Sequence, residues 1–234
     1  MGGLSCPPHK KINYLWNRPK SLFFSKELEL SQNNLMPYSQ FTLQQVTQQF
    51  KLNIVEVSTF LPVTNPVSPS PYLTEFLERN FDLALALNTE KARSEMLICP
   101  ILLAAKEALG GKISLFSGED FTVEPETGLN GICDYILSLS SEQLFVTAPV
   151  AIIVEAKKED LKGGLGQCVA EMLAAQKFNA AKQISIPIIY GSITTGSIWR
   201  FLKLEGQTVT IGLREYSLMP IEQILGILVS FISY

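Results

Sequence analysis

The sequence predicts an α/β protein with three layers, in which helices cover both faces of a central mixed β-sheet. In the second half of the chain a helix is followed by three extended segments, a second helix and further strands, an order typical of such sheets. The run VAIIV at 150–154 is too uniformly apolar for a strand with one face in water. The length of 234 residues allows one principal domain with an N-terminal extension.

Residues 1–37 are predicted to be a poorly ordered basic leader, because they contain turn-forming prolines and no sustained hydrophobic period. Five cations and no carboxylate fall within residues 1–26. Met36 directly precedes a helix pattern, which raises the hypothesis of a second translation start and leaves open whether residues 1–35 belong to the native protein. N-terminal sequencing of the native protein would reject this hypothesis if it found the longer form alone.

Residues 38–86 are predicted to form a helical and extended appendage to the principal domain. Thr42 can cap a short helix that ends near Phe50, and the segment 53–61 reads as extended. The four prolines of PVTNPVSPSP require a loop. The sequence from 70 to 87 then has the pattern of a helix.

Residues 87–234 are predicted to form the principal domain, which begins with a helix over 88–111. That helix is capped at Asn88 or Thr89, kinked by Pro100 and ended by two glycines. The expected strands lie in 112–118, 128–139, 150–158 and 183–194, with a helix over about 166–181 before the last of them. An exposed hairpin turning near Gly206 follows at 197–216, and a helix closes the chain.

Composition and charge restrict the classes of function. No apolar run approaches the roughly 18 to 20 residues that span a bilayer, and the start lacks the order of a secretory signal. The four cysteines show no short paired spacing, so we expect a reduced, cytoplasmic setting without membrane contact. Beyond residue 26 the chain has 14 cations against 22 acids, which is a poor footprint for tight, sequence-independent DNA binding.

The chain has one histidine, His9, which lies in the predicted leader. Ser-His and Cys-His nucleophile pairs and histidine-rich zinc sites need an imidazole beside the reacting group, so the sequence disfavours all three. Cysteine zinc sites are disfavoured as well, because no two cysteines form a CxxC pair. Carboxylates and lysines remain as the candidate catalytic groups.

The stretch VAIIVEAKKED contains the most informative charged residues. The alternation of a strand places Glu155 and Lys157 on one face, with their Cα atoms about 7 Å apart. On their own they could be ordinary charges where a buried strand reaches solvent. The upstream segment GICDYIL changes this, because Asp134 lies inside another apolar run, where an unpaired carboxylate is costly.

A hairpin between these two strands would bring Asp134 beside Glu155. Two carboxylates held close together repel each other unless a cation or a proton lies between them. Oxygen ligands of this kind suit Mg²⁺ or Mn²⁺. The sequence therefore predicts a divalent metal site at the ends of the two strands.

The residues resemble the PD-(D/E)XK nuclease superfamily of restriction-endonuclease-like enzymes, in which an acid on one strand precedes an E-x-K on the next. Here the pattern is Asp134 followed by Glu155, Ala156 and Lys157, and the resemblance in element order extends from about Asn88 to Glu205. Many relatives carry a glutamine on the following helix, which Gln167 matches. The proline of the family pattern is replaced by Cys133, and Glu171 stands where some relatives have an aromatic residue.

The resemblance implies a restriction-endonuclease-like fold and a Mg²⁺- or Mn²⁺-dependent endonuclease. Asp134, Glu155 and the backbone carbonyl of Ala156 would bind the metal, with help from Glu95. Lys157 would orient or deprotonate the attacking water, with Gln167 beside it. Nucleic acid is the expected partner, DNA being favoured over RNA, and the sequence leaves open whether the chain forms a homodimer.

Several alternatives remain open from the sequence. Glu95 could instead complement the positive end of its helix, and Gly163, Gly164 and Gly166 could cradle a phosphate or simply form turns. The chain could also be a catalytically silent nucleic-acid-binding or scaffold protein that retains the nuclease fold. A third class would use Lys157 as a desolvated amine nucleophile without a metal.

Overall fold

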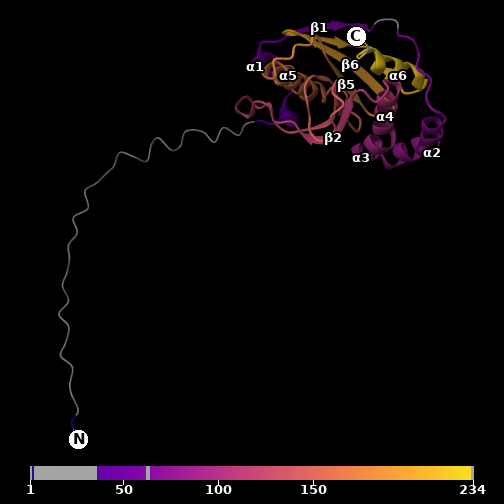
Figure 1. Cartoon of the computed structure of the whole chain (residues 1–234), viewed down its shortest axis with the longest axis horizontal. Helices are drawn as coiled ribbons and strands as arrows, with labels where there is room; N and C mark the ends of the chain where they lie inside the picture. The colour runs from indigo at the N-terminus through magenta and orange to yellow at the C-terminus, as the bar shows by residue number, and fades with distance from the viewer. Residues whose placement is uncertain (1, 3–35, 62–63, 233–234) are drawn as a thin grey trace. The chain divides into compact units, whose positions relative to one another are not determined.

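One mixed β-sheet of eight strands forms the centre of the fold (Figure 1). Its order is β1-β7-β6-β5-β4-β3-β2, with β8 paired to β6. Neighbouring strands pair antiparallel except β1 with β7 and β4 with β5, which are parallel. The strands are β1 (Asn53–Val57), β2 (Ser114–Asp120), β3 (Ile132–Ser138), β4 (Val150–Ala156), β5 (Ile189–Thr194), β6 (Ile198–Glu205), β7 (Thr208–Gly212) and β8 (Tyr216–Ser217).

This computed structural model describes residues 2, 36–61 and 64–232. The predicted leader, including His9, therefore lies almost wholly outside the described residues. Residues 35–234 belong to one compact unit.

Helices cover both faces of the sheet, which confirms the predicted α/β class with a mixed, helix-flanked sheet (Figure 1). One face packs against α1 (Leu43–Phe50) and α5 (Leu165–Ala181), and the short η1 (Tyr38–Gln40) lies beside α5. The opposite face packs against α2 (Pro71–Leu87), α4 (Cys99–Ala108) and α6 (Ile221–Ser230). Every residue of β4 is buried, as expected for the apolar run at 150–154, and this burial includes Glu155.

Two of the predicted helices begin where their capping residues indicate. The Thr42 hydroxyl accepts a hydrogen bond from the Gln45 backbone amide, and the Gln45 side-chain oxygen accepts one from the Thr42 backbone amide. Helix α1 therefore starts with a capping box. Ser70 caps α2 in the same sense, with Pro71 at the first helical position. The expected helices near 42–50 and 70–87 are confirmed.

The predicted helix over 88–111 is interrupted. Thr89 caps the short α3 (Glu90–Arg93), which passes through a π-helical segment, η2 (Ser94–Ile98), into α4. The irregularity thus precedes Pro100, where we expected a kink. Pro100 has no backbone N–H and cannot form the α-helical hydrogen bond to the carbonyl four residues earlier. The turn before it is π-helical and therefore wider than an α-helical turn.

The segment 38–86 differs from the expected appendage. β1 pairs in parallel with β7 along its whole length, and α1 packs against α5. This segment therefore contributes an edge strand and covering helices to the same unit as residues 87–232. Strand β1 is only half-buried, and its partner lies far along the chain, so local patterns in the sequence could not reveal the pairing.

The predicted hairpin at 197–216 is present, but it is not exposed. β6 and β7 pair antiparallel and turn at Gly206, which has a φ of 57°. Phe201, Leu202 and Val209 are fully or almost fully buried. The expectation of an exposed hairpin was wrong because β1 covers the outer edge of β7 and the hairpin contributes side chains to both cores.

Candidate functional site

The candidate site lies where β3 begins and β4 ends. The two strands pair antiparallel with Tyr135 opposite Val154 and Ile136 opposite Ile153. Continuing this register by one position places Asp134 opposite Glu155. The hairpin expected from the sequence therefore brings these two carboxylates side by side.

Asp134 is fastened to the end of β4 through the backbone. The Ala156 amide donates a hydrogen bond to Asp134 Oδ2 over 2.8 Å. Burial raises the pKa of Asp134, and the hydrogen bond from Ala156 opposes that rise. The carboxylate is thus oriented by the strand whose next residue is Lys157.

Glu155 is a buried acid with one unpaired oxygen. Its side chain is 1% exposed, and Oε1 forms an ion pair with Lys157 Nζ. Oε2 has no hydrogen-bond partner among the described residues. Burial, followed by repulsion from Asp134, raises the pKa of Glu155 to about 8. At neutral pH this carboxyl group therefore favours its protonated form, unless a cation takes the place of the proton.

Lys157 joins this acid to helix α5. Its Nζ also donates to Gln167 Oε1 over 3.2 Å. Burial alone would lower the pKa of Lys157, but the adjacent Glu155 carboxylate outweighs burial and raises it. A lysine that acts as an amine nucleophile needs a lowered pKa. The raised pKa of Lys157 therefore disfavours the hypothesis that it is a metal-free amine nucleophile.

Gln167 is oriented by Glu171, one helical turn further along α5. The Gln167 amide donates to Glu171 Oε1 over 3.0 Å, which leaves its oxygen directed at Lys157. Glu171 is fully buried, and its Oε2 has no partner among the described residues. Burial, then repulsion from Glu155, raises the pKa of Glu171 well above its ordinary value. We call Glu155, Lys157, Gln167 and Glu171 the buried polar network.

Sequence reasoning treated Glu171 only as a departure from the family pattern. In the structure its carboxyl group accepts a hydrogen bond from the Gln167 side-chain amide and so orients that side chain. The i, i+4 spacing of the two side chains on one helix was the signal that could have revealed this pair.

The glycines before α5 make room for close packing. A Cβ at Gly164 would lie 3.1 Å from Cε of Lys157, and one at Gly166 would lie 2.1 Å from the Phe41 carbonyl oxygen. A side chain at Gly164 would therefore press on the lysine, and one at Gly166 would separate α5 from the start of α1. This packing accounts for both residues without a bound phosphate.

Glu95 lies in the same cleft as Asp134 but has its own partner. The cleft has a volume of about 350 Å³, and its lining includes Asp134, Ala156, Glu95 and Glu90. Glu95 is 60% exposed and pairs with Lys91 over 2.8 Å, one turn earlier. The structure thus places Glu95 in this cleft, paired within its own helical segment rather than with a residue of the strands. We call the cleft lined by Asp134, Ala156, Glu95 and Glu90 the acid cleft.

Sequence reasoning missed Glu90, which also lines the acid cleft. Its charge adds, after burial and Asp134, to the rise in the pKa of Glu155. Because Glu90 opens α3 directly after the Thr89 cap, its position in the first turn was readable from the sequence. Its proximity to β4 was not, since that depends on how α3 packs.

The residues present fit a divalent cation in chemistry but do not form a finished cage. Asp134, Glu155 and the Ala156 carbonyl are oxygen donors of the kind that Mg²⁺ takes, and Glu155 has a free oxygen. Within residues 36–61 and 64–232, however, no three His, Cys, Asp or Glu side chains are grouped closely enough to hold a metal ion. Three of the acids instead have partners within the protein: Glu155 pairs with Lys157, Glu95 pairs with Lys91, and Asp134 accepts a hydrogen bond from the Ala156 amide.

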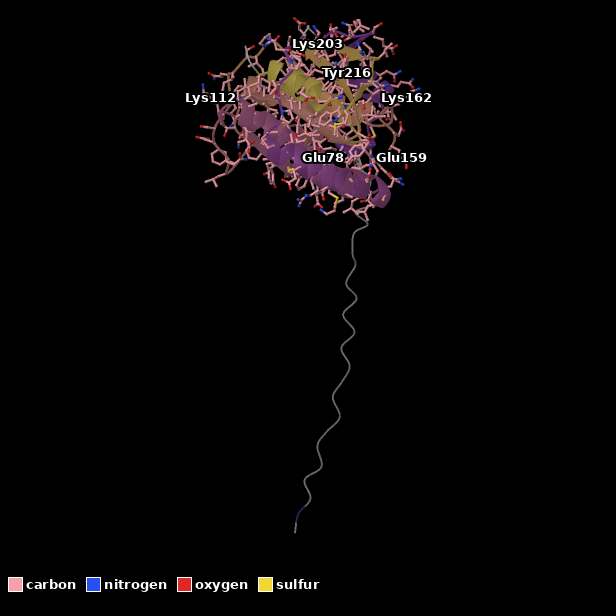
Figure 2. The ribbon with its side chains drawn as sticks, turned by 90° about the vertical axis from the view of Figure 1, so that its right-hand side faces the viewer. Glu78, Lys112, Glu159, Lys162, Lys203 and Tyr216 are labelled. Atoms are coloured by element: carbon pink, nitrogen blue, oxygen red, sulfur yellow. The ribbon has the colours of Figure 1, made fainter. Side chains whose placement is uncertain are left out.

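Other cations near the site are mostly paired. Lys158, Arg200 and Lys203 each form an ion pair with a neighbouring glutamate. Figure 2 labels Glu159 and Lys162, just beyond the end of β4, on the opposite side of the unit from Lys112, which precedes β2. Glu159 and Lys162 line a pocket of about 250 Å³. Arg200 and Glu215 also line it, so its wall has both positive and negative side chains.

No helix in the described part of the chain is both long and apolar enough to cross a membrane. Comparisons of the chain with protein-family models, with curated proteins and with solved structures found no match.

Proposed function

We propose that this chain is a metal-dependent nuclease with a restriction-endonuclease-like fold and a PD-(D/E)XK-type site. The observation that carries the proposal is the pairing of Asp134 with Glu155 across two strands, with Lys157 on the same strand end. Three acids, Asp134, Glu155 and Glu171, influence one another's ionisation around a single lysine. A divalent cation would balance this excess of negative charge.

Asp134, Glu155 and the carbonyl of Ala156 would hold the ion, with Glu95 joining them once it leaves Lys91. A bound Mg²⁺ or Mn²⁺ lowers the pKa of water and stabilises negative charge on a phosphodiester. The chain's own contribution is positional. Asp134 is held in place by the Ala156 amide, so the first ligand needs little reordering.

Lys157 has the second role in this proposal. Its ammonium group lies within reach of Glu155 and Gln167 and would orient the attacking water or stabilise charge on a phosphoryl oxygen. If Glu155 left Lys157 to bind a metal ion, the Gln167 oxygen would remain as the hydrogen-bond partner that keeps Lys157 at the site. Glu171 fixes the Gln167 amide for that purpose.

Nucleic acid, with DNA favoured over RNA, is the proposed substrate, because the acids and the lysine together suit a phosphodiester. The chain beyond residue 26 is acidic, so contacts to the phosphate backbone would be local. A cytoplasmic setting belongs to the proposal, which leaves the oligomeric state open.

A second function, a nucleic-acid-binding or scaffold protein that keeps the fold without activity, is favoured by one observation. No group of three candidate ligands is assembled within the described residues, and Glu155 is closed onto Lys157. Such a protein would bind oligonucleotides equally well with Mg²⁺ or with EDTA and would leave them intact.

The test is incubation with labelled single- and double-stranded DNA and RNA in Mg²⁺, Mn²⁺ or EDTA. We expect cleavage with either metal and none in EDTA, and loss of cleavage in Asp134→Asn, which keeps the shape of the side chain. Equal residual activity in the wild type and the variant would contradict the proposal, since it would indicate a contaminant.

A further inference from the structure

A second hollow continues from the acid cleft between α2 and the η2–α4 segment. It has a volume of about 240 Å³ and shares Glu95 and Cys99 with the acid cleft. Its remaining lining residues are Ser70, Tyr72, Leu73, Phe76, Pro100, Leu103, Ala104 and Glu107. We call it the aromatic groove.

The wall of the aromatic groove presents aromatic and aliphatic surface to solvent. Tyr72 is 74% exposed and Leu103 is 47% exposed, although α2 has a buried face of its own formed by Leu73 and Leu77. The rings of Tyr72 and Phe76 lie 6.1 Å apart on successive turns of α2. Because Ser70 caps this helix and Pro71 starts it, the backbone that carries Tyr72 is fixed.

The charge of the groove excludes a phosphate as its occupant. Glu95 and Glu107 are its charged lining residues, and no lysine or arginine belongs to the described lining. A phosphate would be repelled there. A neutral planar ring would stack on the aromatic wall, and the Glu107 carboxylate would accept a hydrogen bond from an exocyclic amino group, since Glu95 is proposed as a metal ligand.

We propose that the aromatic groove binds an unpaired nucleobase of the substrate strand, with preference for bases that carry an exocyclic amino group. This inference rests on the proposed nuclease function and adds a substrate class to it, namely single-stranded or locally unpaired nucleic acid. A base held within a duplex would not reach Tyr72, because its faces are covered by neighbouring bases.

The test measures binding by fluorescence anisotropy in the full chain carrying Lys157→Ala, so that cleavage does not interfere. The probes are oligo-dC, oligo-dT, oligo-rC, an abasic oligonucleotide of equal length and a DNA duplex. Tyr72→Ala should weaken oligo-dC binding on the order of tenfold and leave the abasic probe and the duplex unchanged. Oligo-dT should bind more weakly than oligo-dC, and oligo-rC would show whether RNA is accepted in the same way.

Two control variants accompany this measurement. Tyr72→Phe keeps the ring and should bind oligo-dC like the parent. Phe145→Ala removes a ring that is 60% exposed in the loop between β3 and β4, at the other end of these strands from Asp134, and should have no effect. Loss of affinity in Phe145→Ala equal to that in Tyr72→Ala would overturn the inference.

Failure of the groove and failure of the nuclease proposal give different results. If the wild type cleaves in an Asp134-dependent manner while Tyr72→Ala binds oligo-dC like its parent, the groove assignment is wrong on its own. Equal weakening of oligo-dC and the abasic probe by Tyr72→Ala would also overturn it. If no metal supports cleavage while Tyr72 still distinguishes oligo-dC from the abasic probe, the groove stands and the nuclease proposal fails.

Discussion

Two buried polar side chains on the same face of α5 differ in how well they are paired. Asn179 receives a hydrogen bond from the Val150 amide and donates one to the Val150 carbonyl, each over 2.8 Å. Glu171, two turns earlier, has one oxygen with a partner and one without. Asn179 therefore forms a fully paired structural contact at the start of β4, whereas carboxyl oxygens without partners lie at its end.

This difference in hydrogen bonding indicates different roles for the two ends of β4, with stability at its start and function at its end. Buried polar groups normally find partners, so an exception calls for a specific explanation. At the end of β4 the exception includes two carboxylate oxygens, on Glu155 and Glu171. Under the proposed function that end of the strand would bind a cation and a phosphodiester, whereas the contacts of Asn179 at the other end serve folding.

The largest expected effect comes from Lys157→Ala. Cleavage should fall by about 10² to 10⁴, the usual contribution of a positioned acid or base. The fold should persist, as checked by circular dichroism and by the melting temperature. A Lys157→Ala enzyme with full activity would remove the lysine from the mechanism.

Asn179→Ala should show the opposite profile. It leaves the amide and the carbonyl of Val150 buried without partners, which costs about 2 to 3 kcal/mol of unfolding free energy. Urea denaturation measures this loss, and the cleavage rate at a temperature where the variant is folded should be unchanged. A change in rate without a loss of stability would show that the two ends of β4 are not separate in function.

Glu171→Gln should change stability and activity in opposite directions. A glutamine can still accept the bond from Gln167. It also replaces an acid that has an unpaired oxygen and that burial forces to take up a proton on folding. In EDTA we expect stability to rise by about 1 kcal/mol, while cleavage falls on the order of tenfold because the environment of Lys157 is altered. If stability and activity both fell, Glu171 would be a structural residue like Asn179.

The smallest expected effect concerns Glu124, which lies outside the candidate site and forms an ion pair with Lys177. The hydrogen bond from Lys177 and then that from Thr127 lower the pKa of Glu124. A lowered pKa stabilises the fold at pH values above that of the unfolded chain, about 4.3, and the contribution is lost as pH falls through the lowered value. Glu124→Gln should cost about 0.5 kcal/mol at pH 7.

Thermal melts of the wild type and Glu124→Gln between pH 7 and pH 2.5 measure this contribution. The difference should shrink as the pH falls below about 4. A difference that grew at low pH would reverse the assigned sign.

The sequence predicted most of the elements because their signals are local. The cap at Thr42, the apolar run of β4 and the turn at Gly206 each depend on a few neighbouring residues. The pairing of β1 with β7 depends on residues distant in the chain and on a half-exposed strand, so it was not foreseen. The burial of the β6–β7 hairpin follows from that pairing and was missed for the same reason.

The site divides in a similar way. Asp134, Glu155 and Lys157 could be proposed from strand alternation and from the cost of a buried acid, and the register of β3 with β4 brings them together. The pair of Glu95 with Lys91 has the local i, i+4 spacing of a helix, whereas the presence of Glu90 beside β4 depends on how α3 packs. The task of Glu171 became clear only when its bond to Gln167 was visible.

The central claim is that a divalent cation balances the acids at the end of β4. Isothermal titration calorimetry of the full chain with Mn²⁺ and Mg²⁺, beside Asp134→Asn, measures this directly. We expect saturable binding of both ions to the wild type and a loss of that binding in Asp134→Asn. Absence of saturable binding to the wild type, or equal binding to the variant, would contradict the claim.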